Sequence, residues 1–171
     1  MKQKSEEEKL AESRKRKAYG KKYRGVKEKK KCHEVWSEIV RIRDGHCVIC
    51  GKETSLAAHH FVTSAARSLR NRYDTANGIT LCFGHHNHGV HVEASYAFTK
   101  KLVDIALAQG SLTQEKLDAL LSEPEDSAEE KKKGREFFEG VLKQLQAERD
   151  ALKQKKEAEK QTAQQTTLNQ E

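Results

Sequence analysis

The stretch from Cys47 to His91 constrains this chain more than any other part of it. Six of the eight histidines and three of the four cysteines lie there. Two pairs of residues that can bind metal share a two-residue gap, Cys47-x-x-Cys50 and Cys82-x-x-His85, and 31 residues lie between Cys50 and Cys82. Zinc prefers four such ligands in a tetrahedron. The spacing therefore predicts a structural zinc site formed by Cys47, Cys50, Cys82 and His85.

A redox-active Cys-x-x-Cys pair is the alternative interpretation of Cys47 and Cys50. That chemistry needs a thioredoxin-like βαβ setting, and it leaves the second pair of ligands unexplained. A disulfide framework would suit an exported chain, but the charged N-terminus is not followed by an apolar signal segment. No apolar run approaches the length of a membrane span. We therefore expect reduced, metal-bound thiols in a cytoplasmic chain.

Hydrophobic periodicity predicts an α+β fold, in which a small zinc-braced core of two strands and a helix carries flanking helices. The apolar run 56–62 and the β-branched run 79–82 are the expected strands, and Asn77-Gly78 is a strong turn signal before the second of them. Helical patterns cover 32–44, about 86–109, a segment that Ser111 would cap and Pro124 would close, and 134–160. Trp36 is the expected core anchor of the first helix.

The net charge of +7 is distributed unevenly along the chain. Residues 1–31 hold 14 Lys and Arg against 5 Asp and Glu, which gives +9 and suits either a solvated tail or a nucleic-acid-binding arm. The long amphipathic helix could pair two chains as a homodimer. We divide the chain into a basic, partly disordered arm (1–31), a core domain (32–108), a helical extension (109–124), a charged linker with the long helix (125–160) and a disordered tail (161–171).

Five histidines remain in the stretch from Cys47 to His91 when the zinc set is filled: His59, His60, His86, His88 and His91. Neighbouring residues on a strand point to opposite faces, so His59 and His60 cannot share one role. The loop 63–76 carries Arg67, Arg70 and Arg72, which suit contacts with phosphate, although a solvated loop with Arg–Asp pairs would look the same. Cys32 and His33 form an isolated pair that we leave outside any metal site.

The order of these residues resembles the HNH nuclease motif, also called the ββα-metal finger. The resemblance rests on His59-His60, Asn77, Cys82-x-x-His85-His86 and His91. The segments WSEIVRIRDGHCVICG and YDTANGITLC are similar to the phage branch of the family, which includes recombination nucleases of the NinG kind. The resemblance covers roughly 32–108. It implies a metal-dependent endonuclease that hydrolyses DNA phosphodiesters, working in the host bacterial cytoplasm if a phage encodes it.

Position by position, the resemblance also implies roles for single residues. His60 would be the general base that takes a proton from the attacking water, and Asn77 would orient the backbone of that histidine. His59 and His86 would be ligands of a catalytic divalent ion, Mg²⁺ or another metal. His91 is the favoured third ligand, with His88 as the alternative.

Two departures from the family pattern keep alternatives open. His85 stands where the family more often has cysteine, so His86 or His88 could serve the zinc instead. A regular helix would place the partner of His86 at position 90, but that residue is Val90 and the next histidine comes one position later. The alternative function is a catalytically inactive zinc finger that binds nucleic acid or assists packaging.

Overall fold

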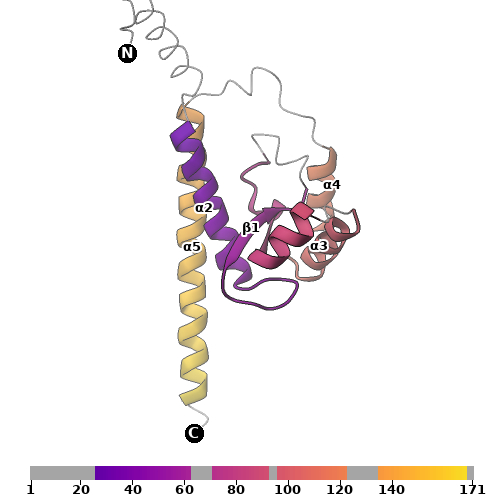
Figure 1. The fold of residues 1–171 in the computed structure, drawn as a ribbon. Coiled ribbons are helices and arrows are strands. Elements are labelled where there is room, and N and C mark those ends of the chain that lie inside the picture. The colour runs from indigo at the N-terminus through magenta and orange to yellow at the C-terminus, as the bar shows by residue number, and fades with distance from the viewer. Residues whose placement is uncertain (1–25, 63–70, 93–95, 123–134, 169–171) are drawn as a thin grey trace, which may run out of the picture.

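The computed structural model describes residues 26–62, 71–92, 96–122 and 135–168, and it has the α+β class expected from the sequence. None of the described helices is both long enough and apolar enough to cross a membrane. Most of the basic arm and the charged linker lie outside the described residues. In chain order the elements are α2 (Val26–Asp44), β1 (Leu56–His60), η2 (Thr75–Asn77), β2 (Gly78–Cys82), η3 (His85–Val92), α3 (Tyr96–Ala108), α4 (Gln114–Ser122) and α5 (Arg135–Leu168) (Figure 1).

The two strands form an antiparallel hairpin with a long connection, as the sequence predicted. Leu56 lies opposite Cys82 and His60 lies opposite Gly78. Every residue of β2 is buried, whereas the residues of β1 are partly exposed. The expected turn before β2 is the short 3-10 helix η2, whose first turn is capped by the Asp74 carboxylate, an acceptor for the Ala76 N–H at 2.9 Å. The hairpin therefore places the end of β1 beside the start of β2.

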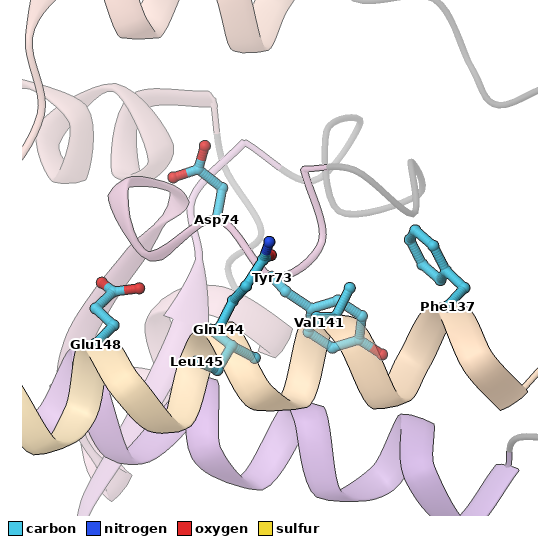
Figure 2. A pocket seen from close by; sticks show the side chains of 7 residues that line it. All are labelled: Tyr73, Asp74, Phe137, Val141, Gln144, Leu145 and Glu148. Carbon is cyan, nitrogen blue, oxygen red and sulfur yellow. The ribbon is translucent and has the colours of Figure 1, made fainter.

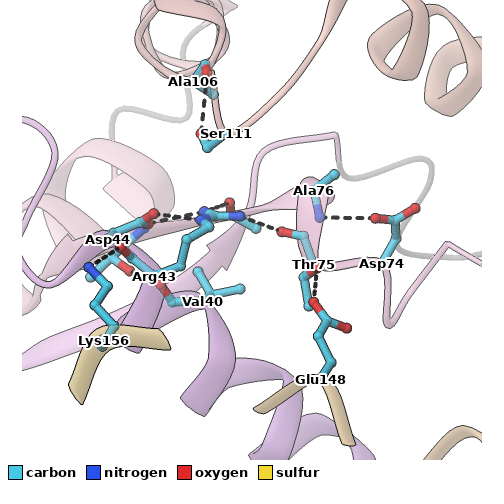
Figure 3. A network of polar contacts seen from close by, with 12 residues as sticks. Val40, Arg43, Asp44, Asp74, Thr75, Ala76, Ala106, Ser111, Glu148 and Lys156 are labelled. Carbon is cyan, nitrogen blue, oxygen red and sulfur yellow. Dashed lines mark hydrogen bonds and ion pairs between the residues drawn. The ribbon is translucent and has the colours of Figure 1, made fainter. Parts of the chain in front are cut away.

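The last turn of α2 is tied to the hairpin by a polar network (Figure 3). Asp44 Oδ2 accepts a hydrogen bond from the Thr80 N–H at 2.8 Å. Arg43 pairs with Asp44 at 2.7 Å and donates to the carbonyls of Thr75 and Gly78 at 2.8 and 2.7 Å. Charge-assisted hydrogen bonds of this kind are stronger than neutral ones. The chain that leaves α2 is thereby fixed next to β2.

The helices α2 and α5 lie side by side and run in the same direction (Figure 1). Trp36 is fully buried, which confirms it as a core anchor. Glu38 on the rim of the contact pairs with Lys153 at 2.7 Å and with Arg149 at 3.5 Å. The apolar residues of α5 that suggested a dimer thus pack within the chain. The buried cluster consists of Cys32, Val35, Trp36, Ile39, Val40, Tyr73, Phe138 and Leu145.

We expect Gly78→Ala to destabilise the fold by about 1–3 kcal/mol, because β2 starts where α2 approaches it most closely. A methyl group on Gly78 would lie 2.5 Å from Val40 Cγ2 and 2.8 Å from Trp36 Cζ2. Gly140→Ala on α5 is the matched control, since a methyl group there meets nothing within 4 Å and alanine favours a helix. Urea denaturation measures both. Equal midpoints for Gly78→Ala and the parent would contradict the close approach.

The helices after β2 differ from the expected pattern in two respects. The single helix expected from residue 86 is two helices, η3 and α3, and the backbone of η3 at Gly89 lies against the Phe98 ring. Gly110 ends α3 with a φ of +71°, as expected. The prediction that Ser111 caps the next helix is wrong. Thr113 Oγ1 accepts the Lys116 N–H at 3.2 Å, while the Ser111 hydroxyl donates to the Ala106 carbonyl.

The long helix α5 continues to Leu168, so it includes most of the segment 161–171 that we expected to be disordered. The segment is polar, but its alanine and glutamine residues are good helix formers, and a helix that is already nucleated extends at little cost. Residues 169–171 lie outside the described residues. The division of the chain into domains remains a prediction.

Candidate metal centre and histidine site

The first two cysteines lie in a tight loop that directly follows α2. Gly45 closes the helix, with a φ of +73° and an N–H bonded to the Arg41 carbonyl at 2.9 Å. The Cys47 N–H then donates to the Lys52 carbonyl, and the Gly51 N–H donates to the Cys47 carbonyl, each at 2.8 Å. Gly51 also has a φ of +73°, a conformation that side chains rarely allow. The loop thus turns both cysteines of the Cys-x-x-Cys pair toward the hairpin.

The four residues predicted to bind zinc come together, with all their ligand atoms within 4.8 Å of one another. Nδ1 of His85 lies 3.4 Å from the sulfurs of both Cys47 and Cys82. The Cys50 and Cys82 sulfurs are 3.9 Å apart. Zinc–sulfur bonds near 2.3 Å and zinc–nitrogen bonds near 2.0 Å give tetrahedral edges of about 3.8 Å and about 3.5 Å. The donor set therefore fits a structural Zn²⁺, and this prediction is confirmed at the level of a Cys3His metal group.

The surroundings of Cys47 prepare it as a thiolate ligand. Burial opposes ionisation, but hydrogen bonds from the backbone N–H groups of Cys82, Ile49 and Cys50 and from the His85 ring lower the pKa of Cys47 to about 6. A thiol must lose its proton to bind zinc, so this environment lowers the cost of loading the metal near neutral pH.

The histidine that completes the zinc group is His85 and not its neighbour His86. Nδ1 of His85 faces two of the cysteine sulfurs. His86 instead meets His59 from β1 edge to face, with ring centroids 5.4 Å apart and an interplanar angle of 77°. The alternative in which His86 serves the zinc is thus not the arrangement found. The side chain of His88 lies outside the described residues.

Two of the three residues predicted to bind a catalytic metal, His59 and His86, are therefore neighbours. The side chain of the third, His91, lies outside the described residues, but the backbone that carries it is informative. The segment η3 is a π-helix, in which hydrogen bonds close five residues apart. This wider turn brings position 91 nearer to the face of His86 than a regular α-helix would, although position 90 still lies closer to one full turn beyond position 86. Among the described residues, the Cys3His cluster is the one group of three or more metal ligands that comes together.

His60 lies on the other side of β1 from the contact between His59 and His86. Its ring stacks on the buried Trp36 of α2, with centroids 3.9 Å apart and planes 5° from parallel. Nε2 lies 2.8 Å from the Arg72 carbonyl oxygen. A carbonyl only accepts, so Nε2 carries the proton in the neutral ring and Nδ1 keeps the lone pair. Burial lowers the pKa of His60 to about 4, and the charges of His33 and Arg72 act in the same direction.

Asn77, predicted to orient the base histidine, is fully buried beside the end of β1. Its Oδ1 accepts the Val62 N–H at 3.0 Å, and its Nδ2 donates to the Val62 carbonyl at 3.1 Å. One side chain thus bonds both backbone groups of a residue two positions after His60. The geometry supports a role in holding the chain that follows the two histidines.

The predicted phosphate-binding arginines are described only in part, because Arg67 and Arg70 lie outside the described residues. The Arg72 side chain bonds to the Tyr73 hydroxyl, which in turn donates to the Lys29 carbonyl at 3.2 Å. Sequence reasoning missed His33, which stacks on Trp36 and lies 6.1 Å from His60 between ring centroids. A signal was available, since residue 33 precedes the predicted core anchor by one helical turn.

A groove of about 300 Å³ between α5 and the turn that contains Tyr73 does not suit a nucleic acid (Figure 2). Two carboxylates line it, and both are engaged. Asp74 pairs with Lys116 at 2.6 Å, and Glu148 accepts a hydrogen bond from the Thr75 hydroxyl at 2.7 Å. Acidic groups repel phosphate, so we do not assign this groove to the functional site. Its lining residues are Tyr73, Asp74, Phe137, Val141, Gln144, Leu145 and Glu148.

As the pH falls from about 6.5 to 4, the free energy of unfolding should decrease more steeply in the parent than in His60→Gln. The folded-state pKa of His60 lies below its ordinary value, so the unfolded chain binds the extra proton first. The stability contributed by neutral His60 is complete above pH 6.5 and is lost as the pH falls toward 4, by at most about 1.4 kcal/mol per pH unit. Urea denaturation at pH 7, 6 and 5 measures the two slopes. Because protonation of the zinc ligands affects both proteins, equal slopes would contradict the burial of a neutral His60.

Comparisons with known proteins give this arrangement no counterpart, since no family model, no curated protein and no solved structure matches the chain.

Proposed function

We propose that this protein is a metal-dependent endonuclease of the HNH type, from the phage branch of that family, and that it hydrolyses DNA phosphodiester bonds. One observation carries the proposal. The two neighbouring histidines at the end of β1 face opposite sides of the strand. The His59 ring contacts His86 on η3, whereas a backbone carbonyl orients the His60 ring. A purely structural zinc finger needs neither feature, because its four ligands are already supplied by Cys47, Cys50, Cys82 and His85.

His60 is proposed as the general base. The hydrogen bond from Nε2 to the Arg72 carbonyl fixes the tautomer and leaves the Nδ1 lone pair to take a proton from the attacking water. With a pKa of about 4, the ring is neutral at physiological pH and its lone pair is free, but it is a weaker base than a histidine of ordinary pKa. Asn77 would keep this geometry by holding both backbone groups of Val62.

A divalent ion would be held by His59 and His86, with His91 proposed as the third ligand. Imidazole ligands suit transition metals such as Ni²⁺, whereas Mg²⁺ prefers oxygen ligands and would take most of them from water and the phosphate. When bound, the ion would neutralise the negative charge that develops on the leaving 3′-oxygen. Hydrolysis in this sense leaves 5′-phosphate and 3′-hydroxyl ends.

DNA is the proposed partner, held through its phosphates. Arg72 at the site, Arg67 and Arg70 before it, and the basic residues 1–31 would supply the positive charge. Binding should then weaken steeply as salt rises, because each neutralised phosphate releases counterions. A homodimer remains a proposal without support from the packing, since the apolar face of α5 lies against α2 in the same chain.

The experiment that tests the proposal is plasmid nicking by the full-length, zinc-loaded protein. We expect supercoiled plasmid to become open circles only when Mg²⁺, Mn²⁺ or Ni²⁺ is added. A protein with one bound zinc that cuts no plasmid, branched or single-stranded DNA with any of these ions would contradict the proposal.

A catalytically inactive zinc finger that binds nucleic acid is the second candidate. The packing of His60 on Trp36 favours it, because a largely buried ring with a lowered pKa can serve the core alone. This candidate predicts salt-sensitive DNA binding with no cutting and no difference in DNA affinity between the parent and His60→Asn. Nicking that requires both an added metal ion and His60 would exclude it.

A further inference from the structure

His33 occupies the outer edge of a stack of three rings. It precedes Trp36 by one turn of α2, and the two rings are 5.4 Å apart and 18° from parallel. His60 stacks on the same indole at 3.9 Å, and the two imidazole rings are 6.1 Å apart and 19° from parallel. Trp36 is fully buried, whereas His33 is exposed. A molecule in solution can therefore reach this stack at His33.

Arg72 supplies the positive charge at this edge, where the rings of His33 and His60 are uncharged near neutral pH. Burial lowers the pKa of His33, and the guanidinium of Arg72 lowers it further, as it also does for His60. Glu34 acts on His33 in the opposite direction, but it also pairs with Lys30 at 3.7 Å. A neutral imidazole can still donate a hydrogen bond from its ring N–H, and a guanidinium nearby favours an anion as the acceptor.

The geometry points to a binding site for a DNA phosphodiester formed by His33 and Arg72 next to His60, an inference that rests on the proposed function. His33 donates a hydrogen bond to a phosphate oxygen, and Arg72 donates from its guanidinium while Tyr73 steadies that side chain. His33 is a binding residue here and takes no part in proton transfer. The His33 ring lies 6.1 Å from the His60 ring, so a phosphate bound to His33 keeps the DNA close to the proposed base.

The test uses the full-length, zinc-loaded protein and a thymidine dinucleotide, which contains a single phosphodiester. Trp36 is the only tryptophan, so its fluorescence reports directly on the stack. We expect His33→Gln to bind the dinucleotide about tenfold more weakly and to raise KM for plasmid nicking with a smaller change in kcat. His33→Lys should restore the binding, because the ammonium group also donates hydrogen bonds to phosphate. Arg72→Gln removes the guanidinium but keeps the carbonyl that bonds His60, and it should weaken binding to a similar degree.

The matched control is His46→Gln, which makes the same change at an exposed histidine in the turn after α2 and should behave as the parent. If His33→Gln keeps its fold and zinc and matches the parent in affinity and KM, the phosphate site is wrong even where the parent cuts DNA. Binding that depends on His33 in a parent that never cuts would support the site and reject the nuclease. The two failures are therefore distinguishable.

Discussion

Cys47→Ser is expected to lose the bound zinc and to lower the free energy of unfolding by roughly 3 kcal/mol or more, and a chelator should do the same to the parent. The reason is that the metal group joins three separate segments of the chain. Cys47 and Cys50 come from the loop after α2, Cys82 ends β2, and His85 begins η3. A hairpin of two five-residue strands is marginal in water without further support. Zinc content by elemental analysis and thermal denaturation by circular dichroism measure the effect.

Cys32→Ser is the matched control for this change. Cys32 is also buried, but it lies in the cluster between α2 and α5, and its sulfur donates to the Phe138 carbonyl at 3.3 Å. The variant should keep one zinc per chain and lose about 1 kcal/mol of stability. Because the helices α2 and α5 have their own apolar cluster, part of the helical signal should survive zinc removal. A Cys47→Ser protein that retains one zinc per chain and melts with the parent would overturn the assignment.

The parts of the site that the sequence predicted correctly are those whose chemistry is local. Metal ligands can be recognised by their residue type and by the two-residue gap between them, so the sequence was enough to identify Cys47, Cys50, Cys82 and His85. The strand at 79–82 and the anchor Trp36 follow from β-branched and apolar patterns. Strand alternation also placed His59 and His60 on opposite faces, and their different partners bear this out.

The parts that the sequence did not predict depend on contacts between distant segments or on unusual backbone. A pattern read with 3.6 residues per turn left His91 one position late, and the wider π-helical backbone of η3 reduces that discrepancy without removing it. His33 looked isolated because its neighbours Trp36 and His60 belong to different elements that meet only in the fold. The apolar stripe of α5 showed that the helix would be covered, but not that α2 would cover it.

His60→Asn is expected to slow plasmid nicking by about 10²–10⁴-fold while the protein keeps its zinc and its affinity for DNA. Removing a general base leaves the metal and the phosphate contacts in place, so the loss should fall on kcat more than on KM. Asparagine keeps a polar amide, but its donor stops short of the Arg72 carbonyl that now bonds Nε2 at 2.8 Å, whereas the longer amide of His60→Gln can reach it. His60→Asn and His60→Ala both remove the ring that stacks on Trp36, so each variant must first be shown to keep its zinc and its melting temperature.

The control for His60→Asn is His46→Asn, which makes the same replacement at an exposed turn residue outside the His59–His86 and His33–His60 contacts. This variant should nick plasmid at the parental rate. His59→Ala and His86→Ala should differ from His60→Asn in one respect. They should need much higher concentrations of the added metal ion, because each removes a proposed ligand and leaves the base intact. If His60→Asn cuts as fast as the parent at saturating metal, another group takes the proton and His60 belongs to the core. If the parent and His60→Asn both bind DNA without cutting it, the opposite orientations of His59 and His60 serve packing alone. The protein is then the catalytically inactive zinc finger.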